Sequence, residues 1–219
     1  MFDFLFRRTP VKSPRFLFLG AHPDDIEIGA GGTIQRLLQC HPTASVVWVV
    51  LSGNVQRAAE AKSSATAYLS TVLEKRILVE TFRDGYFPYQ GEQIKDFFET
   101  LKREIDPDLI LTHYRDDRHQ DHRVVSDLTW NTFRAHSILE YEIPKYDGDL
   151  GQPNMYVALN KSVCESKVHL AINHFTSQTT KHWFTRDTLY SLLRLRGMET
   201  GSHYAEAFYS RKLVVASTD

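Results

Sequence analysis

Short apolar runs alternate with longer amphipathic segments along the first half of the chain. Runs rich in β-branched and aromatic residues are typical of strands that are buried on both faces of a sheet. The predicted strands are 16–21, 45–51, 76–80 and 109–113, and the helical patterns between them cover 31–40, 57–73 and 92–105. Strands that alternate with helices in this order are joined by right-handed crossovers and lie parallel to one another.

The second half of the chain is less regular. Its predicted elements are a helix at 121–135, strands at 139–143 and 155–159, helices at 162–173 and 186–196, and a last strand at 211–215. The whole pattern predicts an α/β fold of three layers, helices on both faces of a mostly parallel sheet, in one domain that spans 1–219. We expect 1–13 to be a loose arm, because chain ends are commonly frayed.

Composition and charge exclude several classes of protein. Of 219 residues, 42% are hydrophobic and 24% are charged, which is ordinary for a globular chain. The formal net charge of -1, without a long basic run, argues against a dedicated nucleic-acid binder. No stretch of the sequence reaches the roughly 20 apolar residues that span a bilayer. Cys40 and Cys164 have no disulfide or metal-ligand spacing, so we expect a soluble protein of the cytoplasm.

Two polar segments directly follow predicted strands. AHPDD at 21–25 comes after the first strand, and HYRDDRHQDH at 113–122 comes at the end of the fourth. In parallel α/β sheets, ligands bind beyond the carboxyl ends of the strands, so we expect both segments to meet at one site. Together they contain the two-histidine, one-carboxylate set that catalytic zinc uses while one position stays open for water.

Two other interpretations of these segments stay open. Asp24, Asp25 and Asp121 are also of the residue type that caps helices by accepting hydrogen bonds from the backbone. The glycines at 29, 31 and 32 suggest a dinucleotide-phosphate turn, but their G-x-G-x-x-G pattern is incomplete and the neighbouring carboxylates would repel a pyrophosphate. We interpret these glycines as allowing the loop and the helix to approach the metal site closely.

At these residues the chain resembles the PIG-L/LmbE-like family of zinc-dependent N-deacetylases. The two hallmarks of that family, A-H-P-D-D and H-x-D-H, are complete here, and the segments 57–61 and 206–208 are similar to its secondary motifs. The resemblance implies a Rossmann-like α/β/α sandwich that hydrolyses the N-acetyl group of an amino-sugar or amino-sugar conjugate. The alternatives are a zinc amidase or deformylase acting on a non-sugar N-acyl compound, and a non-catalytic sugar-binding module.

The resemblance also implies a role for each residue of the two hallmarks. The implied ligands of a single zinc ion are His22, Asp25 and His122. Iron(II) or cobalt can occupy such a set as well as zinc. Asp24 is the implied general base, and a protonated His119, kept charged and oriented by Asp121, is implied to stabilise the substrate oxygen.

Substrate contacts are predicted from residue types around the site. The candidates are Arg57, Glu60, Arg83, Asp84, Arg115, Asp117 and Tyr204, with the loops 84–91 and 144–153 as the rim. Arg57 and Glu60 could equally form a salt bridge on an exposed helix face. Trp183 could stack on a sugar ring, although core packing is the commoner use of aromatic residues. The expected partner is a small N-acetylated sugar or sugar conjugate, and a homo-oligomer is compatible with the sequence.

Overall fold

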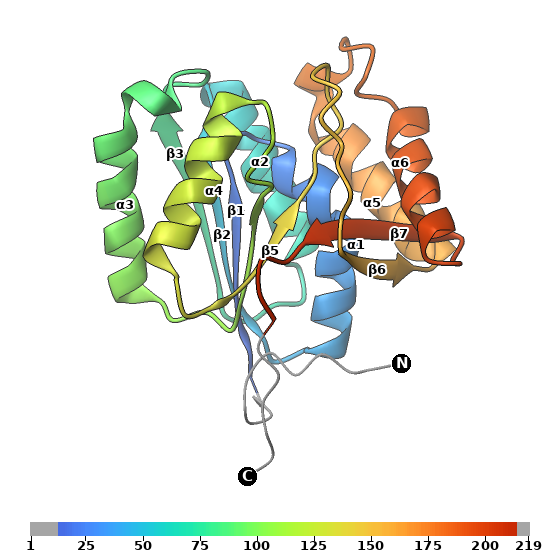
Figure 1. The fold of residues 1–219 in the computed structure, drawn as a ribbon, viewed down its shortest axis with the longest axis horizontal. Coiled ribbons are helices and arrows are strands. Elements are labelled where there is room, and N and C mark those ends of the chain that lie inside the picture. The colour runs from blue at the N-terminus through green and yellow to red at the C-terminus, as the bar shows by residue number, and fades with distance from the viewer. Residues whose placement is uncertain (1–12, 214–219) are drawn as a thin grey trace.

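The computed structural model describes residues 13–213, in which one mixed sheet runs through the molecule (Figure 1). The strands are β1 (Arg15–Gly20), β2 (Ser45–Ser52), β3 (Lys75–Phe82), β4 (Leu109–His113), β5 (Ser137–Tyr141), β6 (Met155–Leu159) and β7 (Tyr204–Tyr209). They lie in the order β3-β2-β1-β4-β5-β7-β6. The first five are parallel, whereas β7 runs antiparallel to both β5 and β6. The predicted three-layer fold with a mostly parallel sheet is confirmed.

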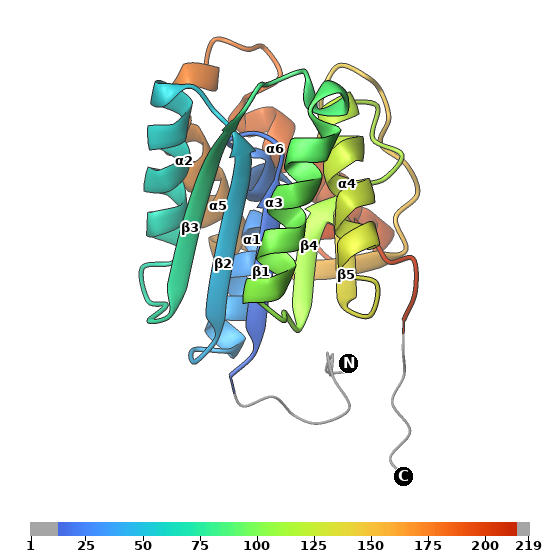
Figure 2. The ribbon, with the colours of Figure 1, turned by 90° about the vertical axis from the view of Figure 1, so that its left-hand side faces the viewer.

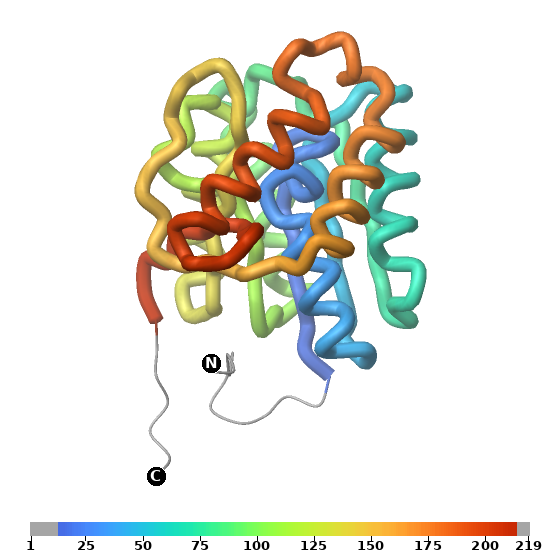
Figure 3. The backbone as a smooth tube through the Cα atoms, turned by 90° about the vertical axis from the view of Figure 1, so that its right-hand side faces the viewer, coloured from blue at the N-terminus to red at the C-terminus, as the bar shows by residue number. Residues whose placement is uncertain are grey.

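Helices cover both faces of this sheet. They are α1 (Asp25–Cys40), α2 (Val55–Tyr68), α3 (Gly91–Glu104), α4 (Gln120–Thr132), α5 (Lys161–His174) and α6 (Arg186–Glu199), with short 3-10 turns at η1 (Phe87–Tyr89) and η2 (Thr176–Gln178). Helices α3 and α4 lie on one face (Figure 2), and α1, α5 and α6 lie on the other (Figure 3). No helix within the described range is both long and apolar enough to cross a membrane.

The sheet separates two hydrophobic cores. Along β1, Phe16 and Phe18 point into the core beneath α1, α2, α5 and α6, while Leu17 and Leu19 point into the core beneath α3 and α4. All four side chains are buried. This double burial follows from the continuous apolar run, because successive side chains of a strand point to opposite faces.

Two predicted elements differ most from the observed ones. The helix expected from residue 31 begins at Asp25, because its first turns are buried all round and therefore show no amphipathic period. The strand expected at 211–215 is wrong for residues 211–213, and the last strand among the described residues is β7. Residues 214–215 and residues 1–12 of the expected arm lie outside the described residues.

The glycines of α1 have a different use from the expected one. A Cβ atom at Gly29 would collide with the ring of Tyr141, and one at Gly31 would collide with the hydroxyl group of Tyr68. Both glycines lie inside the helix. They therefore let aromatic side chains pack against α1, and the expectation that they bring the loop close to the metal site was wrong.

A buried ion pair joins α1 to the opposite end of the sheet. The carboxylate of Glu206 on β7 accepts hydrogen bonds from the backbone N–H groups of Gly32 and Thr33, at 2.8 and 2.6 Å. Lys167 on α5 donates to Glu206 at 2.6 Å and to the carbonyl oxygen of Ile28 at 2.6 Å. These contacts hold the middle of the helix that follows the AHPDD segment and begins at its last residue, Asp25.

We expect Glu206→Gln to lower the free energy of unfolding by about 3 kcal/mol, because it leaves the buried Lys167 ammonium without its carboxylate. Urea unfolding followed by circular dichroism measures the change. Glu165→Gln is the matched control: it breaks the exposed pair with Lys161 and should cost less than about 1 kcal/mol. Equal effects of the two substitutions would contradict a structural role for the buried pair.

Candidate metal centre

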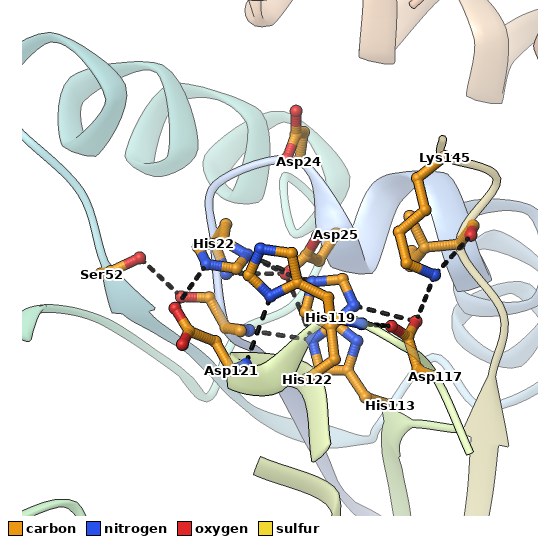
Figure 4. Close-up of polar contacts among 12 residues, drawn as sticks. His22, Asp24, Asp25, Ser52, His113, Asp117, His119, Asp121, His122 and Lys145 are labelled. Carbon is orange, nitrogen blue, oxygen red and sulfur yellow. Dashed lines mark hydrogen bonds and ion pairs between the residues drawn. The ribbon is translucent and has the colours of Figure 1, made fainter. Parts of the chain in front are cut away.

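The two polar segments meet where the strand order reverses. Strand β1 is followed along the chain by β2 and β3 on one side, whereas β4 is followed by β5 on the other side. The carboxyl ends of β1 and β4 are neighbours at this switch point, which is where open α/β sheets bind ligands. Segments 21–25 and 113–122 therefore lie side by side there (Figure 4).

Three donor atoms converge in this place. His22 Nδ1 lies 3.2 Å from His122 Nε2 and 3.4 Å from Asp25 Oδ2, and the last two atoms are 3.6 Å apart. A tetrahedral metal ion with bonds of about 2.1 Å separates its ligand atoms by about 3.4 Å. All three side chains are buried. Their spacing and chemistry fit a small divalent metal ion such as zinc.

The electrostatics of the cluster also favour a cation. Burial lowers the pKa of His22, but the hydrogen bonds that its ring donates to the carboxylates of Asp121, Asp25 and Asp84 outweigh burial and raise that pKa well above its usual value. Burial raises the pKa of Asp25, yet contacts with His122 and His113 hold it well below its usual range. Asp25, Asp84 and Asp121 place negative charge around the two ring nitrogen atoms of His22, which a bound cation would neutralise.

A carboxylate that is not one of the three donors contacts the other ring nitrogen atom of His122. Asp117 Oδ2 lies 2.9 Å from His122 Nδ1 and 2.9 Å from Lys145 Nζ. Burial raises the pKa of Asp117, but the His122 hydrogen bond and the Lys145 charge outweigh it and hold that pKa far below its usual range. Asp117 thus fixes the orientation of a candidate metal ligand, as outer carboxylates commonly do for metal-binding histidines. Asp117 was a predicted substrate contact, but it does not line the cavity.

The side chain of Asp121 contacts His22 and not His119. Its Oδ2 atom lies 3.1 Å from His22 Nε2 and accepts a hydrogen bond from the N–H of Gly85 at 2.6 Å, and its Oδ1 accepts one from the N–H of Phe87 at 3.1 Å. The expected pair between the Asp121 carboxylate and the His119 ring is therefore absent. Asp121 instead orients His22 and ties the loop after β3 to the site.

His119 is arranged as a neutral donor. Its Nδ1 atom accepts a hydrogen bond from the backbone N–H of Asp121 at 3.3 Å, so the ring proton lies on Nε2. Burial, together with the nearby charge of His22, lowers the pKa of His119. The ring lines the cavity, and we correct the expectation of a protonated imidazole to that of a neutral imidazole with an Nε2–H group.

Asp24 stands apart from the three donors and lines the same cavity (Figure 4). It precedes α1 with a left-handed backbone, at φ 94°, and its side chain caps no backbone group. Burial raises the pKa of Asp24 to about 7, while the Arg57 guanidinium, whose Nη2 lies 3.1 Å from Asp24 Oδ1, opposes that rise. The capping interpretation therefore fails for Asp24. It also fails for Asp121, whose carboxylate accepts hydrogen bonds from Gly85 and Phe87 in the loop after β3.

The cavity above the donors has a volume of about 230 Å³. It is lined by His22, Asp24, Asp25, Arg57, Asp84, His119, His122, Ile143, Lys145, Tyr146, Asp147, Lys181 and Trp183. Arg57 and Asp84 are thus placed where substrate contacts were expected, and so is Trp183. Arg57 contacts Asp24, so the exposed salt bridge with Glu60 considered as its alternative is absent.

Four other candidates for substrate contacts lie elsewhere. The Glu60 carboxylate accepts hydrogen bonds from Thr176 and Ser177, and Arg83 lies over the Tyr86 ring. Arg115 is exposed beside Asp116, and Tyr204 packs near Tyr190 on α6. The first three occupy neighbouring loops or helices but turn toward other partners, and Tyr204 lies at the start of β7, away from the β1–β4 edge. The structure does not bring Glu60, Arg83, Arg115 or Tyr204 to the cavity.

Several site residues were not found from the sequence. His113 lies beneath the donors: its Nε2 is 3.0 Å from the N–H of Ala21 and 3.2 Å from Asp25 Oδ2, and its ring stacks on that of His122. Its position at the end of β4, inside the second polar segment, was a usable signal. Lys145 lies in the loop 144–153 expected as the rim but was not singled out there, and Lys181 had no signal, because only the folded loops bring these two side chains to the cavity.

Comparison with known protein families supports a deacetylase relationship. The sequence profile of the PIG-L family, described as GlcNAc-PI de-N-acetylase, matches residues 17–133. An uncharacterized deacetylase of Escherichia coli K12, YaiS, is 30% identical over 145 residues, which cover 61% of this chain and 76% of that protein. The residues 17–133 matched by the family profile include the AHPDD segment and the H-x-D-H segment.

Solved structures show the same fold in enzymes of different chemistry. The N,N′-diacetylchitobiose deacetylase of Pyrococcus horikoshii is 22% identical, with a TM-score of 0.70 over 90% of this chain and 84% of that one. GalB, the 4-carboxy-2-hydroxymuconate hydratase of Pseudomonas putida KT2440, is 19% identical, with a TM-score of 0.72 over 94% and 99% of the two chains. At these identities the likeness concerns the fold alone, so the reaction must be argued from the site.

Proposed function

This chain belongs to the PIG-L family, and on that premise we propose that it is a zinc-dependent hydrolase that removes the N-acetyl group from an amino-sugar or amino-sugar conjugate. The observation that carries the proposal is the convergence of His22, Asp25 and His122, with donor atoms 3.2 to 3.6 Å apart, beneath a cavity that Asp24 also lines. The cytoplasmic location stays a prediction.

The proposed metal ligands are His22 Nδ1, Asp25 Oδ2 and His122 Nε2. When bound, zinc supplies a Lewis acid for the amide carbonyl group and lowers the pKa of water to about 7. The protein holds both imidazole rings in place through their other nitrogen atoms, with Asp121 at His22 and Asp117 at His122. Such outer contacts fix the ring orientation and the tautomer before a ligand arrives.

Asp24 is the proposed general base. Its buried carboxylate has a pKa near the usual operating pH, which suits a group that must accept and then release a proton. Arg57 fixes its orientation by contacting both Asp24 Oδ1 and the carbonyl oxygen of Pro23. Asp24 takes a proton from the attacking water, whose oxygen forms the new bond to the acetyl carbon.

His119 is the proposed donor to the oxygen that gains charge. Its Nδ1 atom is held by the backbone, which leaves the Nε2–H group free to donate to the carbonyl oxygen of the amide as negative charge develops there. The C–N bond then breaks, and the proton taken by Asp24 passes to the leaving amine, directly or through His119. The products are acetate and the free amino-sugar.

The size and lining of the cavity favour one sugar ring. Its volume of about 230 Å³ lies below the roughly 300 to 1,000 Å³ typical of sites for drug-sized ligands. Tyr146 and Trp183 lie at its rim, with ring centroids 6.5 Å apart, and offer aromatic faces for a sugar. The family profile, described as GlcNAc-PI de-N-acetylase, supports the same substrate class.

Acetate release tests this proposal. We expect zinc-loaded protein to release acetate from N-acetylglucosamine, N,N′-diacetylchitobiose or a glycosidic or nucleotide conjugate of N-acetylglucosamine, to lose that activity with a chelator, and to regain it with zinc. Release only from non-sugar N-acyl compounds would support the amidase alternative. Zinc binding without release from any compound of either kind would support the binding module.

A further inference from the structure

Lys145 lies between two buried carboxylates next to the metal centre. Its Nζ atom is 2.9 Å from Asp117 Oδ2 and 2.5 Å from Asp149 Oδ2. The side chains of Lys145, Asp117 and Asp149 are 9%, 2% and 6% exposed, so solvent screens these charges little. One ammonium group therefore neutralises two acids that belong to different parts of the site.

The first of these acids serves the metal centre. Asp117 Oδ1 accepts a hydrogen bond from the N–H of His119 at 2.7 Å, and Asp117 Oδ2 accepts from His122 Nδ1 at 2.9 Å. The carboxylate thus holds a proposed metal ligand and the segment that carries His119. Figure 4 shows Lys145 reaching down to this carboxylate from the loop that follows β5.

The second acid serves the rim of the cavity. Asp149 Oδ2 accepts from Lys145 and from the backbone N–H of Arg118 at 2.7 Å, so it ties the 144–153 loop to the segment that follows β4. Tyr146 and Asp147 lie between these anchors and line the cavity. Their side chains are exposed, and the loop that presents them to substrate is held from its two ends.

We propose that Lys145 is a positioning residue that couples the substrate-facing loop to the metal ligand His122 by sharing its charge between Asp117 and Asp149. The inference rests on the proposed function. Without the ammonium group, the two buried carboxylates lose the donor that both of them contact, so they repel one another and move apart. This movement weakens the support of His122 and releases the loop at the same time.

Two substitutions separate the effect of Lys145 on the metal centre from its effect on the 144–153 loop. Lys145→Met removes the shared charge and should lower zinc affinity by about 10- to 100-fold, the usual effect of losing an outer contact of a metal ligand. Asp149→Asn leaves the Lys145–Asp117 pair intact and should leave zinc affinity unchanged. Lys145→Arg keeps the charge and should recover zinc affinity relative to the methionine variant.

Zinc affinity is measured by competition with a chromophoric chelator, and loop order by hydrogen exchange of the 144–153 backbone. We expect faster loop exchange in both Lys145→Met and Asp149→Asn, but weaker zinc binding only in the former. Wild-type zinc affinity in Lys145→Met, or an equal loss in both variants, would overturn the proposal. Circular dichroism checks folding, and Lys145→Gln takes the place of the methionine variant if that one does not fold.

The same experiment distinguishes failure of this inference from failure of the proposed function. If the unsubstituted protein binds no zinc in the competition assay, the proposed function fails and the coupling with it. If it binds zinc and Lys145→Met binds zinc equally well, only the coupling fails. Neither readout requires the natural substrate.

Discussion

Asp24→Asn is expected to lower kcat for acetate release by about 10²- to 10⁴-fold while zinc stays bound, which is the usual contribution of a positioned general base. The amide of asparagine has nearly the shape of the carboxylate but cannot accept the proton of the attacking water. Asp24 is not one of the three converging donors, so its replacement leaves the metal ligands in place. Steady-state kinetics and the zinc content of the purified variant measure the two effects.

The choice of asparagine follows from the backbone at this position. Asp24 has a φ of 94°, in the left-handed region that asparagine and aspartate tolerate better than other residues with a side chain. Alanine would add strain of about 1–2 kcal/mol directly before Asp25 and so disturb the metal site as well. Asp116→Asn is the control, since it changes an exposed carboxylate of the second polar segment. A fully active Asp24→Asn variant would exclude Asp24 as the base.

Much of the fold could be predicted because the decisive patterns are local. The buried strands are continuous apolar runs, and β4 and β6 were predicted with their observed bounds. The start of α1 was missed because Asp25 and Glu27 alternate with Ile26 and Ile28 and all four are buried, so the usual amphipathic period is absent there. Strand β7 was missed because Glu206 interrupts the apolar residues of YAEAFY, whereas the predicted segment RKLVV is not a strand within its described part.

The candidate site, like the fold, could be predicted only in part. The family resemblance of two contiguous motifs at neighbouring strand ends implied His22, Asp25 and His122, and the structure brings these three together. The spacing of residues within a motif does not show in which direction each side chain points. Asp121 lies two positions from His119 in sequence, but α4 begins between them and turns the Asp121 carboxylate toward His22. Contacts made by the 144–153 loop depend on the folded chain, which is why Lys145 was not found.

Asp25→Asn is expected to lower zinc affinity by more than about 100-fold, beyond the usual loss for an outer contact of a ligand, and to reduce acetate release to the background rate. Asp25 Oδ2 is the only anionic atom among the three proposed donors. An amide oxygen is neutral and a weaker ligand for zinc than a carboxylate. Competition with a chromophoric chelator measures the affinity.

Asp25 also lies in the first turn of α1, where any negative charge interacts favourably with the helix dipole. Asp187→Asn is therefore the matched control, because Asp187 is an exposed aspartate in the first turn of α6 and away from the cavity. It removes the same charge from an equivalent helix position and should leave zinc affinity and acetate release unchanged. If Asp25→Asn behaved like Asp187→Asn, Asp25 would be a helix-stabilising residue, and the metal centre would need a different third ligand.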